Sequence, residues 1–294
     1  MLKTHGRYPY RPIVERPDWT WPDGRRLAVY VAVNIEQFPF GEGLGVPLAP
    51  VQPEPDVVNY SWRDYGNRVG VWRLIELFDE LQVPAAALTN AEIYDHAPQI
   101  MAAFRRRGDE VVGHGRTNAE RQGTMPEDDE RRLIAEATAT ITRHEGKPPA
   151  GWMGPWVSES AATPDLLQEA GYRYVMDWGH DDQPVWLKTR RGRLLSIPYP
   201  RPTNDLPVLH GHGGSPSDWA DMLVDHFDEM LHQSRHQALV CNLSLHPFLA
   251  GFGFRLRQLR RALAHIARHR DRIWLTHPGR IAEHAAALPE GLIV

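Results

Sequence analysis

The sequence predicts a single-domain α/β fold, a (β/α) barrel, and two observations support this prediction. Eight short apolar runs, rich in Val, Leu, Ile and Tyr, alternate with amphipathic stretches, which is the order expected for parallel strands connected by helices. Neither a glycine-rich dinucleotide fingerprint nor a Walker-type loop follows the first run. A barrel is therefore favoured over a doubly wound nucleotide-binding sheet.

The expected strands are apolar at consecutive positions, as strands covered on both faces are. They are expected at residues 27–35, 85–89, 110–113, 150–153, 172–176, 194–197, 239–245 and 272–275. Helices are expected between them, from the helical spacing of apolar residues and from capping signals such as Gly108, Gly146 and Ser215. These helices are expected at residues 69–81, 99–107, 127–145, 163–171, 219–233, 254–268 and 280–287.

Two segments lack this periodicity. Residues 1–23 are rich in Pro, Trp and Arg and are expected to form an arm on the surface of a barrel domain that spans residues 24–294. Residues 41–60 are expected to form a long Pro-rich loop. Because this loop follows the first strand, a barrel would place it over the active-site mouth.

Composition excludes several classes of protein. Of the 294 residues, 42% are apolar and 24% are charged, which excludes disorder and coiled coil as the main class. The 33 basic and 37 acidic residues give a net charge of −4 with no basic block, so no nucleic-acid partner is expected. A single cysteine, Cys241, excludes a disulfide within the chain and a cysteine zinc site. The longest apolar stretch, residues 27–35, is too short to span a bilayer, so we expect a cytoplasmic protein without a membrane partner.

Polar side chains follow most of the expected strands. Glu36 follows the first strand, His114 the third and His246 the seventh. In a parallel barrel the carboxyl ends of the strands meet at one mouth. A carboxylate and imidazoles gathered there are the usual groups for general acid–base work on water and a leaving group. The alternative is that polar residues only mark where strands stop.

Several motifs in order resemble a known family. They are residues 65–74 (YGNRVGVWRL), Asn34-Ile35-Glu36, Gly113-His114-Gly115, residues 181–184, residues 197–199 with 203–205, and Leu245-His246-Pro247. With them the chain resembles the polysaccharide deacetylase superfamily over about residues 20–285. Within it, the chain is similar to the branch of the metal-independent allantoinase and related cyclic amide or imide hydrolases. The resemblance implies a distorted (β/α) barrel of the deacetylase type and a homo-oligomer.

The resemblance also bears on metal binding. Metal-dependent members carry an Asp-His-His triad. Here Glu36 stands at the base position, Gln37 replaces the metal-binding Asp and Asn118 replaces the second His. Amide oxygens are poor zinc ligands, so we expect no metal cofactor. The alternatives are a weaker divalent-metal site, for example for zinc, built on Glu36 and His114 with a residue such as Asp177, and a metal pair at His210 and His212, which otherwise are exposed loop histidines.

The residues and the resemblance together predict a hydrolase of a non-peptide carbon–nitrogen bond in a small cyclic amide, imide or ureide. Glu36 would take a proton from water, with its pKa raised towards neutrality by burial. His246 would protonate the leaving nitrogen, and His114 would position the water or polarise the carbonyl. The small-molecule substrate would be the only partner besides copies of the chain.

Six further residues are predicted to bind the substrate. Arg68 would hold a substrate oxygen or carboxylate, although a surface salt bridge is the plainer interpretation. Aromatic walls and strand-end polar groups complete the set, with plain core packing as the alternative for the tryptophans: Trp152, Trp156, Trp178, Asp177 and Asn204. Two other functions stay open here, namely a metal-dependent N-deacetylase of an acetylated sugar and a non-catalytic barrel that binds a small ligand.

Overall fold

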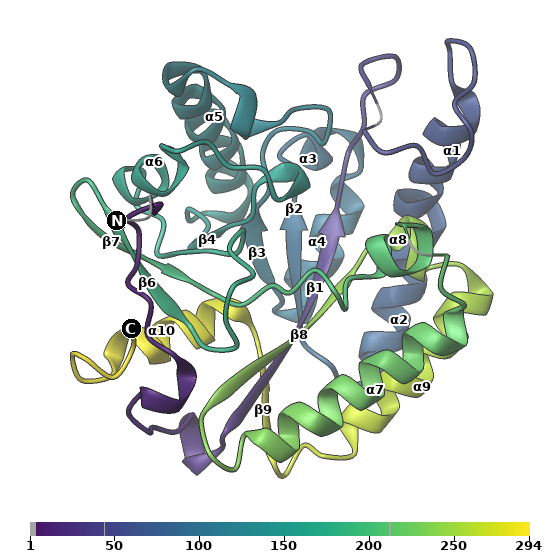
Figure 1. The fold of residues 1–294 in the computed structure, drawn as a ribbon. Coiled ribbons are helices and arrows are strands. Elements are labelled where there is room, and N and C mark those ends of the chain that lie inside the picture. The colour runs from purple at the N-terminus through teal and green to yellow at the C-terminus, as the bar shows by residue number, and fades with distance from the viewer. Residues whose placement is uncertain (1–3, 44, 212) are drawn as a thin grey trace.

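The computed structural model describes residues 4–43, 45–211 and 213–294, and these form a strongly curled sheet covered by helices (Figure 1). In these residues the sheet has nine strands in the order β6-β7-β5-β4-β3-β2-β1-β8, and β9 also pairs with β1. All pairs are parallel except the hairpin of β6 and β7. The strands are β1 Leu27–Ile35, β2 Ala85–Thr89, β3 Glu110–Gly113, β4 Gly151–Trp152, β5 Tyr174–Val175, β6 Val185–Thr189, β7 Gly192–Ser196, β8 Leu239–Leu245 and β9 Ile273–Thr276.

The predicted distorted barrel is confirmed, with two differences in its strands. Strand β6 was not predicted, because its residues alternate between buried and exposed positions and lack a continuous apolar run. The ladder also stays open between β6 and β8. There the backbone N–H of Val240 donates to the carbonyl of Asp182 at 2.8 Å, and the Gln183 amide donates to the carbonyl of Ala238 at 2.8 Å. These contacts bridge the gap without a continuous strand pairing.

Most of the predicted helices are present within a few residues. They are α2 Val71–Leu81, α4 Pro98–Arg107, α5 Glu127–Glu145, α6 Thr163–Glu169, α7 Pro216–Gln233, α9 Gly253–Ala267 and α10 Pro278–Ala287. Three others were not predicted: α1 Val57–Tyr65, α3 Ile93–His96 and α8 Pro247–Ala250. Helix α1 begins inside the segment that was expected to be a loop. The Asp56 side chain caps it by accepting from the backbone N–H of Asn59 at 3.0 Å.

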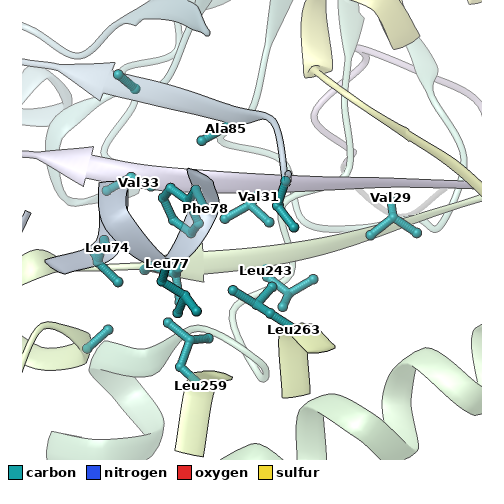
Figure 2. Close-up of a cluster of buried hydrophobic side chains, with 14 of the residues drawn as sticks. Val29, Val31, Val33, Leu74, Leu77, Phe78, Ala85, Leu243, Leu259 and Leu263 are labelled. Carbon is teal, nitrogen blue, oxygen red and sulfur yellow. The ribbon is translucent and has the colours of Figure 1, made fainter. Parts of the chain in front are cut away.

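The central strands divide their side chains between two cores. Odd-numbered residues of β1, from Leu27 to Ile35, pack against the helices, together with Leu74, Phe78 and other residues of α2, α7 and α9 (Figure 2). Even-numbered residues such as Ala28, Tyr30 and Ala32 face the inside of the curled sheet. Because side chains of a strand alternate between its faces, this phase decides which residues at the strand ends point into the barrel.

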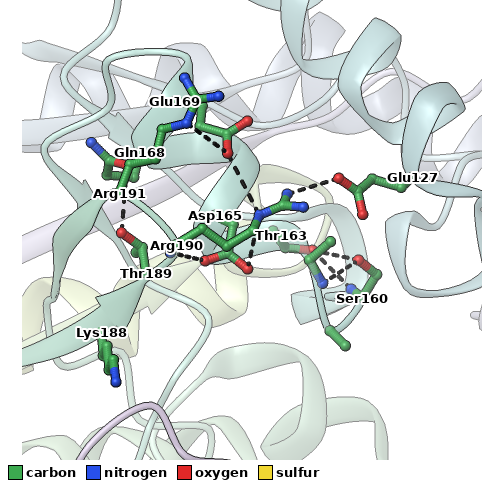
Figure 3. Close-up of polar contacts among 12 residues, drawn as sticks. Glu127, Ser160, Thr163, Asp165, Gln168, Glu169, Lys188, Thr189, Arg190 and Arg191 are labelled. Carbon is green, nitrogen blue, oxygen red and sulfur yellow. Dashed lines mark hydrogen bonds and ion pairs between the residues drawn. The ribbon is translucent and has the colours of Figure 1, made fainter.

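A network of ion pairs ties the β6–β7 hairpin to the neighbouring helices. The Arg190 guanidinium donates to Glu127 Oε1 at 2.7 Å and lies 3.5 Å from Glu169 Oε1, while its backbone N–H donates to Asp165 at 2.7 Å (Figure 3). Arg7 of the N-terminal segment donates to both oxygens of Asp165, at 2.7 and 2.8 Å. Arginine and carboxylate groups thus alternate along this face.

The N-terminal segment has one-turn helices at Ile13–Glu15 and Pro22–Gly24 and lies against the rest of the chain. The Trp21 indole is buried and donates to the carbonyl of Leu239 at 2.9 Å, and Arg16 forms an ion pair with Asp181 at 2.6 Å. In the described residues no helix is both long and apolar enough to cross a membrane.

Candidate active site

The three predicted catalytic side chains line one cavity. Glu36 follows β1 in the inward phase of Ala32 and Asn34, and His246 continues the inward phase of β8. His114 does the same after β3. The cavity has a volume of about 100 Å³. Its wall consists of Asn34, Glu36, Phe38, Val46, Arg63, His114, Asn118, Met153, Trp156, Val157, Arg201, Asn204, Leu206, Pro207, His246 and Phe248.

Glu36 lies between the two imidazoles. Its Oε1 atom is 3.6 Å from Nε2 of His114 and 3.7 Å from Nε2 of His246. All three side chains are buried. Both distances are longer than a hydrogen bond, and a small molecule seated beside the three groups can contact all of them.

His246 is oriented by a buried carboxylate. Asp205 Oδ1 lies 2.6 Å from His246 Nδ1, and Asp205 Oδ2 accepts from the His246 backbone N–H at 2.7 Å. Burial lowers the pKa of His246, but the charge and hydrogen bond of Asp205 outweigh it, so the pKa is raised overall. His246 therefore keeps its proton at higher pH than an ordinary histidine, with Nε2–H directed into the cavity.

His114 is held by a backbone carbonyl. Its Nδ1 atom lies 2.6 Å from the carbonyl oxygen of Met153 and must donate to it. The neutral ring then has its lone pair on Nε2, which faces Glu36. This Nε2 atom is buried and has no hydrogen-bond partner. His114 therefore offers an unused acceptor to a ligand in the cavity.

The prediction that burial raises the pKa of Glu36 is wrong. Burial does act in that direction, but the nearby His114 ring and the charges of His246 and Arg63 lower the pKa overall. Glu36 is thus ionised at neutral pH. Its backbone carbonyl accepts from the Asn67 amide at 2.9 Å, which fixes the chain at this point.

Two glycines of the YGNRVG segment bring α8 and His246 close to the barrel mouth. A Cβ atom on Gly66 would lie 2.7 Å from the backbone nitrogen of Phe248, and one on Gly70 would lie 2.1 Å from the carbonyl oxygen of Pro247. Only glycine permits this backbone approach. The segment between α1 and α2 therefore positions the turn that carries His246.

Part of the predicted loop of residues 41–60 lies over the cavity, at Val46. Val46 lines the cavity, and the indole of Trp156 lies against Gly45, where a Cβ atom would come within 1.8 Å of the ring. Asn59 fixes the covering segment, since its Oδ1 atom accepts from the backbone N–H groups of Leu48 at 2.7 Å and Ala49 at 2.8 Å. The cover is hydrogen-bonded to α1 and does not hang freely.

Several known proteins resemble this chain in sequence and in architecture. A family model described as polysaccharide deacetylase matches residues 52–175. The solved structure of Puue allantoinase aligns with a TM-score of 0.83 at 27% identity over 95% of this chain and 98% of that one. A probable polysaccharide deacetylase from Pseudomonas aeruginosa PAO1 aligns with a TM-score of 0.83 at 26% identity, over 98% of this chain and 100% of its own. The peptidoglycan deacetylase of Helicobacter pylori is 24% identical over 244 residues, 72% of this chain and 82% of its own length.

The chain is thus similar in sequence and in fold to proteins of the polysaccharide deacetylase superfamily, including an allantoinase. These relatives include deacetylases and an allantoinase, which are hydrolases of carbon–nitrogen bonds other than peptide bonds, and this chain is a hydrolase of the same kind. The superfamily includes both metal-dependent deacetylases and the metal-independent allantoinase. The donor set of each member therefore has to be considered separately.

The donor set at this cavity does not fit a tightly bound zinc ion. Asn118 Oδ1, at the position of the second metal-binding histidine, accepts from the Asn90 amide at 3.3 Å. Across residues 4–43, 45–211 and 213–294, only Asp228, His265 and His269 bring three His, Cys, Asp or Glu ligand atoms within 4.8 Å of one another. That group lies on the outer helices and not at the cavity. Of the candidate pair His210 and His212, the second lies outside the described residues.

Four of the predicted substrate-binding residues are not brought to the cavity. Arg68 is 73% exposed and pairs with Asp64. Trp152 is in the outward phase of β4, in the core beneath α5, and its neighbour Met153 faces the cavity instead. Trp178 packs on Tyr8 of the N-terminal segment and donates to Glu159. The remaining one, Asp177, follows β5 in the outward phase and accepts from the backbone of Gly154 at 2.8 Å. Trp156 and Asn204 do line the cavity.

Two residues of the candidate site were not among the predicted site residues. Asp205 appeared only as part of a motif, and its position beside His246 depends on the turn that follows β7. Arg63 lies on the unpredicted helix α1 and reaches the cavity wall. The Asp56 cap just before α1 is the sequence signal that could have indicated this helix.

Proposed function

We propose that this protein is a metal-independent hydrolase that opens the ring of a small cyclic amide, imide or ureide. The observation that carries the proposal is the buried trio of Glu36, His114 and His246, in which both Nε2 atoms lie within 3.7 Å of the carboxylate. The volume of about 100 Å³ supports a small substrate. The amide side chain at Asn118 supports catalysis without zinc.

The trio can divide the reaction between an acid and a base. A water that donates to Glu36 and to the free Nε2 of His114 attacks the substrate carbonyl carbon while Glu36 accepts its proton. A carbon–oxygen bond forms, and the resulting tetrahedral species collapses with cleavage of the carbon–nitrogen bond. The Nε2–H of His246 passes its proton to the departing nitrogen, and Asp205 stabilises the imidazolium before transfer. Proton return from Glu36 to His246 restores the enzyme.

The alternative proposal is metal-dependent removal of an acetyl group from a sugar. It is favoured by the relatives named as polysaccharide or peptidoglycan deacetylases. One panel separates the two reactions: chelator-treated protein is incubated with allantoin, hydantoin, succinimide, glutarimide and an acetylated chitooligosaccharide, and products are identified by mass. Ring opening without added metal supports our proposal. Acetate release that appears only after zinc is restored overturns it.

The largest single effect is expected for Glu36→Gln. The amide keeps the shape of the side chain but cannot accept a proton, so kcat should fall about 10²- to 10⁴-fold. The melting temperature should stay within about 4 °C of the wild type because no buried group is lost. Glu76→Gln, an exposed change on α2, serves as the matched control. Turnover at the wild-type rate in Glu36→Gln would show that another group is the base.

A further inference from the structure

We propose that Arg63 forms an anion-binding subsite of the cavity, so that the preferred substrate is a cyclic amide or ureide bearing a carboxylate. The type of reaction in this inference is taken from the proposed function. The class of substrate is inferred from Arg63 alone. The argument depends on what this guanidinium contacts, which charges surround it and what it leaves unpaired.

Arg63 is buried without a carboxylate partner. Its residue is 4% exposed, and in the described residues no carboxylate oxygen lies within 4.0 Å of it. One amino group donates to the backbone carbonyl of Val46 at 2.6 Å. The Nε and the other amino nitrogen are buried and have no acceptor. Burial lowers the pKa of Arg63 to about 10, which leaves it charged at neutral pH.

Two aromatic rings keep the guanidinium in place. Its central carbon lies 4.3 Å from the ring centre of Phe38 and 5.4 Å from that of Phe248. These contacts fix the plane of the group while they supply no hydrogen-bond acceptor. A planar fork held in this way can bind the two oxygens of a carboxylate, which is the partner that best matches its geometry.

The nearby negative charges are already in use. Both oxygens of Asp205 accept from His246, and Glu36 lies between the two imidazoles. A second arginine, Arg201, also lines the cavity. When His246 is protonated, its charge is balanced by Asp205, so Arg63 and Arg201 remain as two positive groups against the carboxylate of Glu36. A carbonyl of a neutral ring offers Arg63 one uncharged acceptor, whereas a carboxylate offers two oxygens and the opposite charge.

The test compares pairs of compounds, here called twins, that share the same ring and differ in whether they carry a carboxylate. Hydantoin is compared with carboxymethylhydantoin, and dihydrouracil with dihydroorotate, in wild type, Arg63→Met and Arg63→Lys. Wild type should prefer the anionic twin in kcat/KM by about 10- to 100-fold, the range expected for hydrogen bonds to a charged group. Arg63→Met should abolish the preference, and Arg63→Lys should keep part of it. Arg132→Met, which removes an exposed arginine of α5, should keep the full preference.

A binding measurement separates this inference from the proposed function. Glu36→Gln is titrated with the same four compounds by calorimetry, alone and combined with Arg63→Met. Arg63-dependent binding of the anionic twins supports the subsite even if wild type opens no ring. Equal binding of neutral and anionic twins, an unchanged preference in Arg63→Met, or no binding of any compound overturns the subsite.

Thermal melting distinguishes recognition from a structural role. Arg63→Met removes a buried cation that has no carboxylate partner, so the melting temperature should stay the same or rise. A lower melting temperature together with an equal loss of activity on both twins would mean that Arg63 only supports the fold. That result overturns the inference.

Discussion

Two clusters of charge in this molecule are built in opposite ways. On the surface, Arg190 lies among Glu127, Asp165 and Glu169, so that each charge has an opposite charge beside it (Figure 3). In the cavity, Glu36 is beyond hydrogen-bond distance of both histidines, and Arg63 keeps two donors without acceptors.

The comparison shows where the protein retains unsatisfied groups. Exposed ion pairs contribute little to stability, and their loss is tolerated. Buried polar groups without partners lower stability, and those that line a cavity can gain the missing contacts from a ligand. We therefore expect the surface cluster to serve the fold and the cavity cluster to serve the proposed reaction. Substitutions in the two clusters should separate activity from stability.

After Glu36→Gln, the largest loss of activity is expected for a substitution of Asp205. Asp205→Asn removes the charge that holds the proton on His246, so kcat should fall about 10²- to 10³-fold. The pKa of His246 should fall at the same time, which would move the alkaline limb of the rate profile to lower pH. Kinetics over a pH series measures both effects, with the exposed Asp221→Asn as control. An unchanged alkaline limb would show that His246 is not the acid.

The pH profile of the wild type should be unusually broad. The pKa of Glu36 is lowered, so the base stays ionised below the usual glutamate value of about 4.3. The pKa of His246 is raised, so the acid stays protonated above the usual histidine value of about 6.5. We expect kcat/KM to form a plateau between these values and to fall tenfold per unit outside the two limbs. A narrow maximum inside that range would contradict these assignments.

Glu36 and His246 could be predicted from the sequence because the ends of long apolar strands are easy to recognise there. Long apolar runs fixed β1 and β8, and the polar residues directly after them are Glu36 and His246. The alternation of side chains between the two faces of a strand also decides which residues reach the cavity, and β4 shows this. Trp152 was chosen there for its aromatic ring, yet alternation turns it outward and Met153 inward.

Other features depend on contacts that no local pattern shows. Helix α1 buries the polar residues Asn59 and Arg63 and exposes Val57 and Val58, so the usual apolar pattern does not mark its buried face, and Arg63 was assigned to no site. The pKa of Glu36 was predicted from burial alone, whereas its direction is set by His114, His246 and Arg63. Those neighbours come from three different parts of the chain. Their combined effect on the pKa of Glu36 can be judged only from the folded structure.

A smaller effect on activity is expected for a substitution of Asn59, which joins the segment over the cavity to α1. Asn59→Ala removes the acceptor of the Leu48 and Ala49 N–H groups and leaves these donors unpaired. The cover should loosen, and KM should rise about tenfold while kcat changes less. The control is Ser61→Ala, an exposed change on the same helix. Equal changes in kcat and KM for both variants would show that the cover does not limit binding.

The smallest effect is expected in the surface cluster. Arg190→Met removes the guanidinium, but the backbone N–H of Arg190 still donates to Asp165 and keeps the hairpin attached to α6. The melting temperature should fall by no more than about 2 °C, and the difference should shrink in high salt because exposed pairs are screened. Kinetic constants should not change. Arg63→Met is the informative counterpart, since it should lose substrate preference without losing stability. If Arg190→Met instead lowered activity, the division of the charged residues into a group for the fold and a group for the reaction would be wrong.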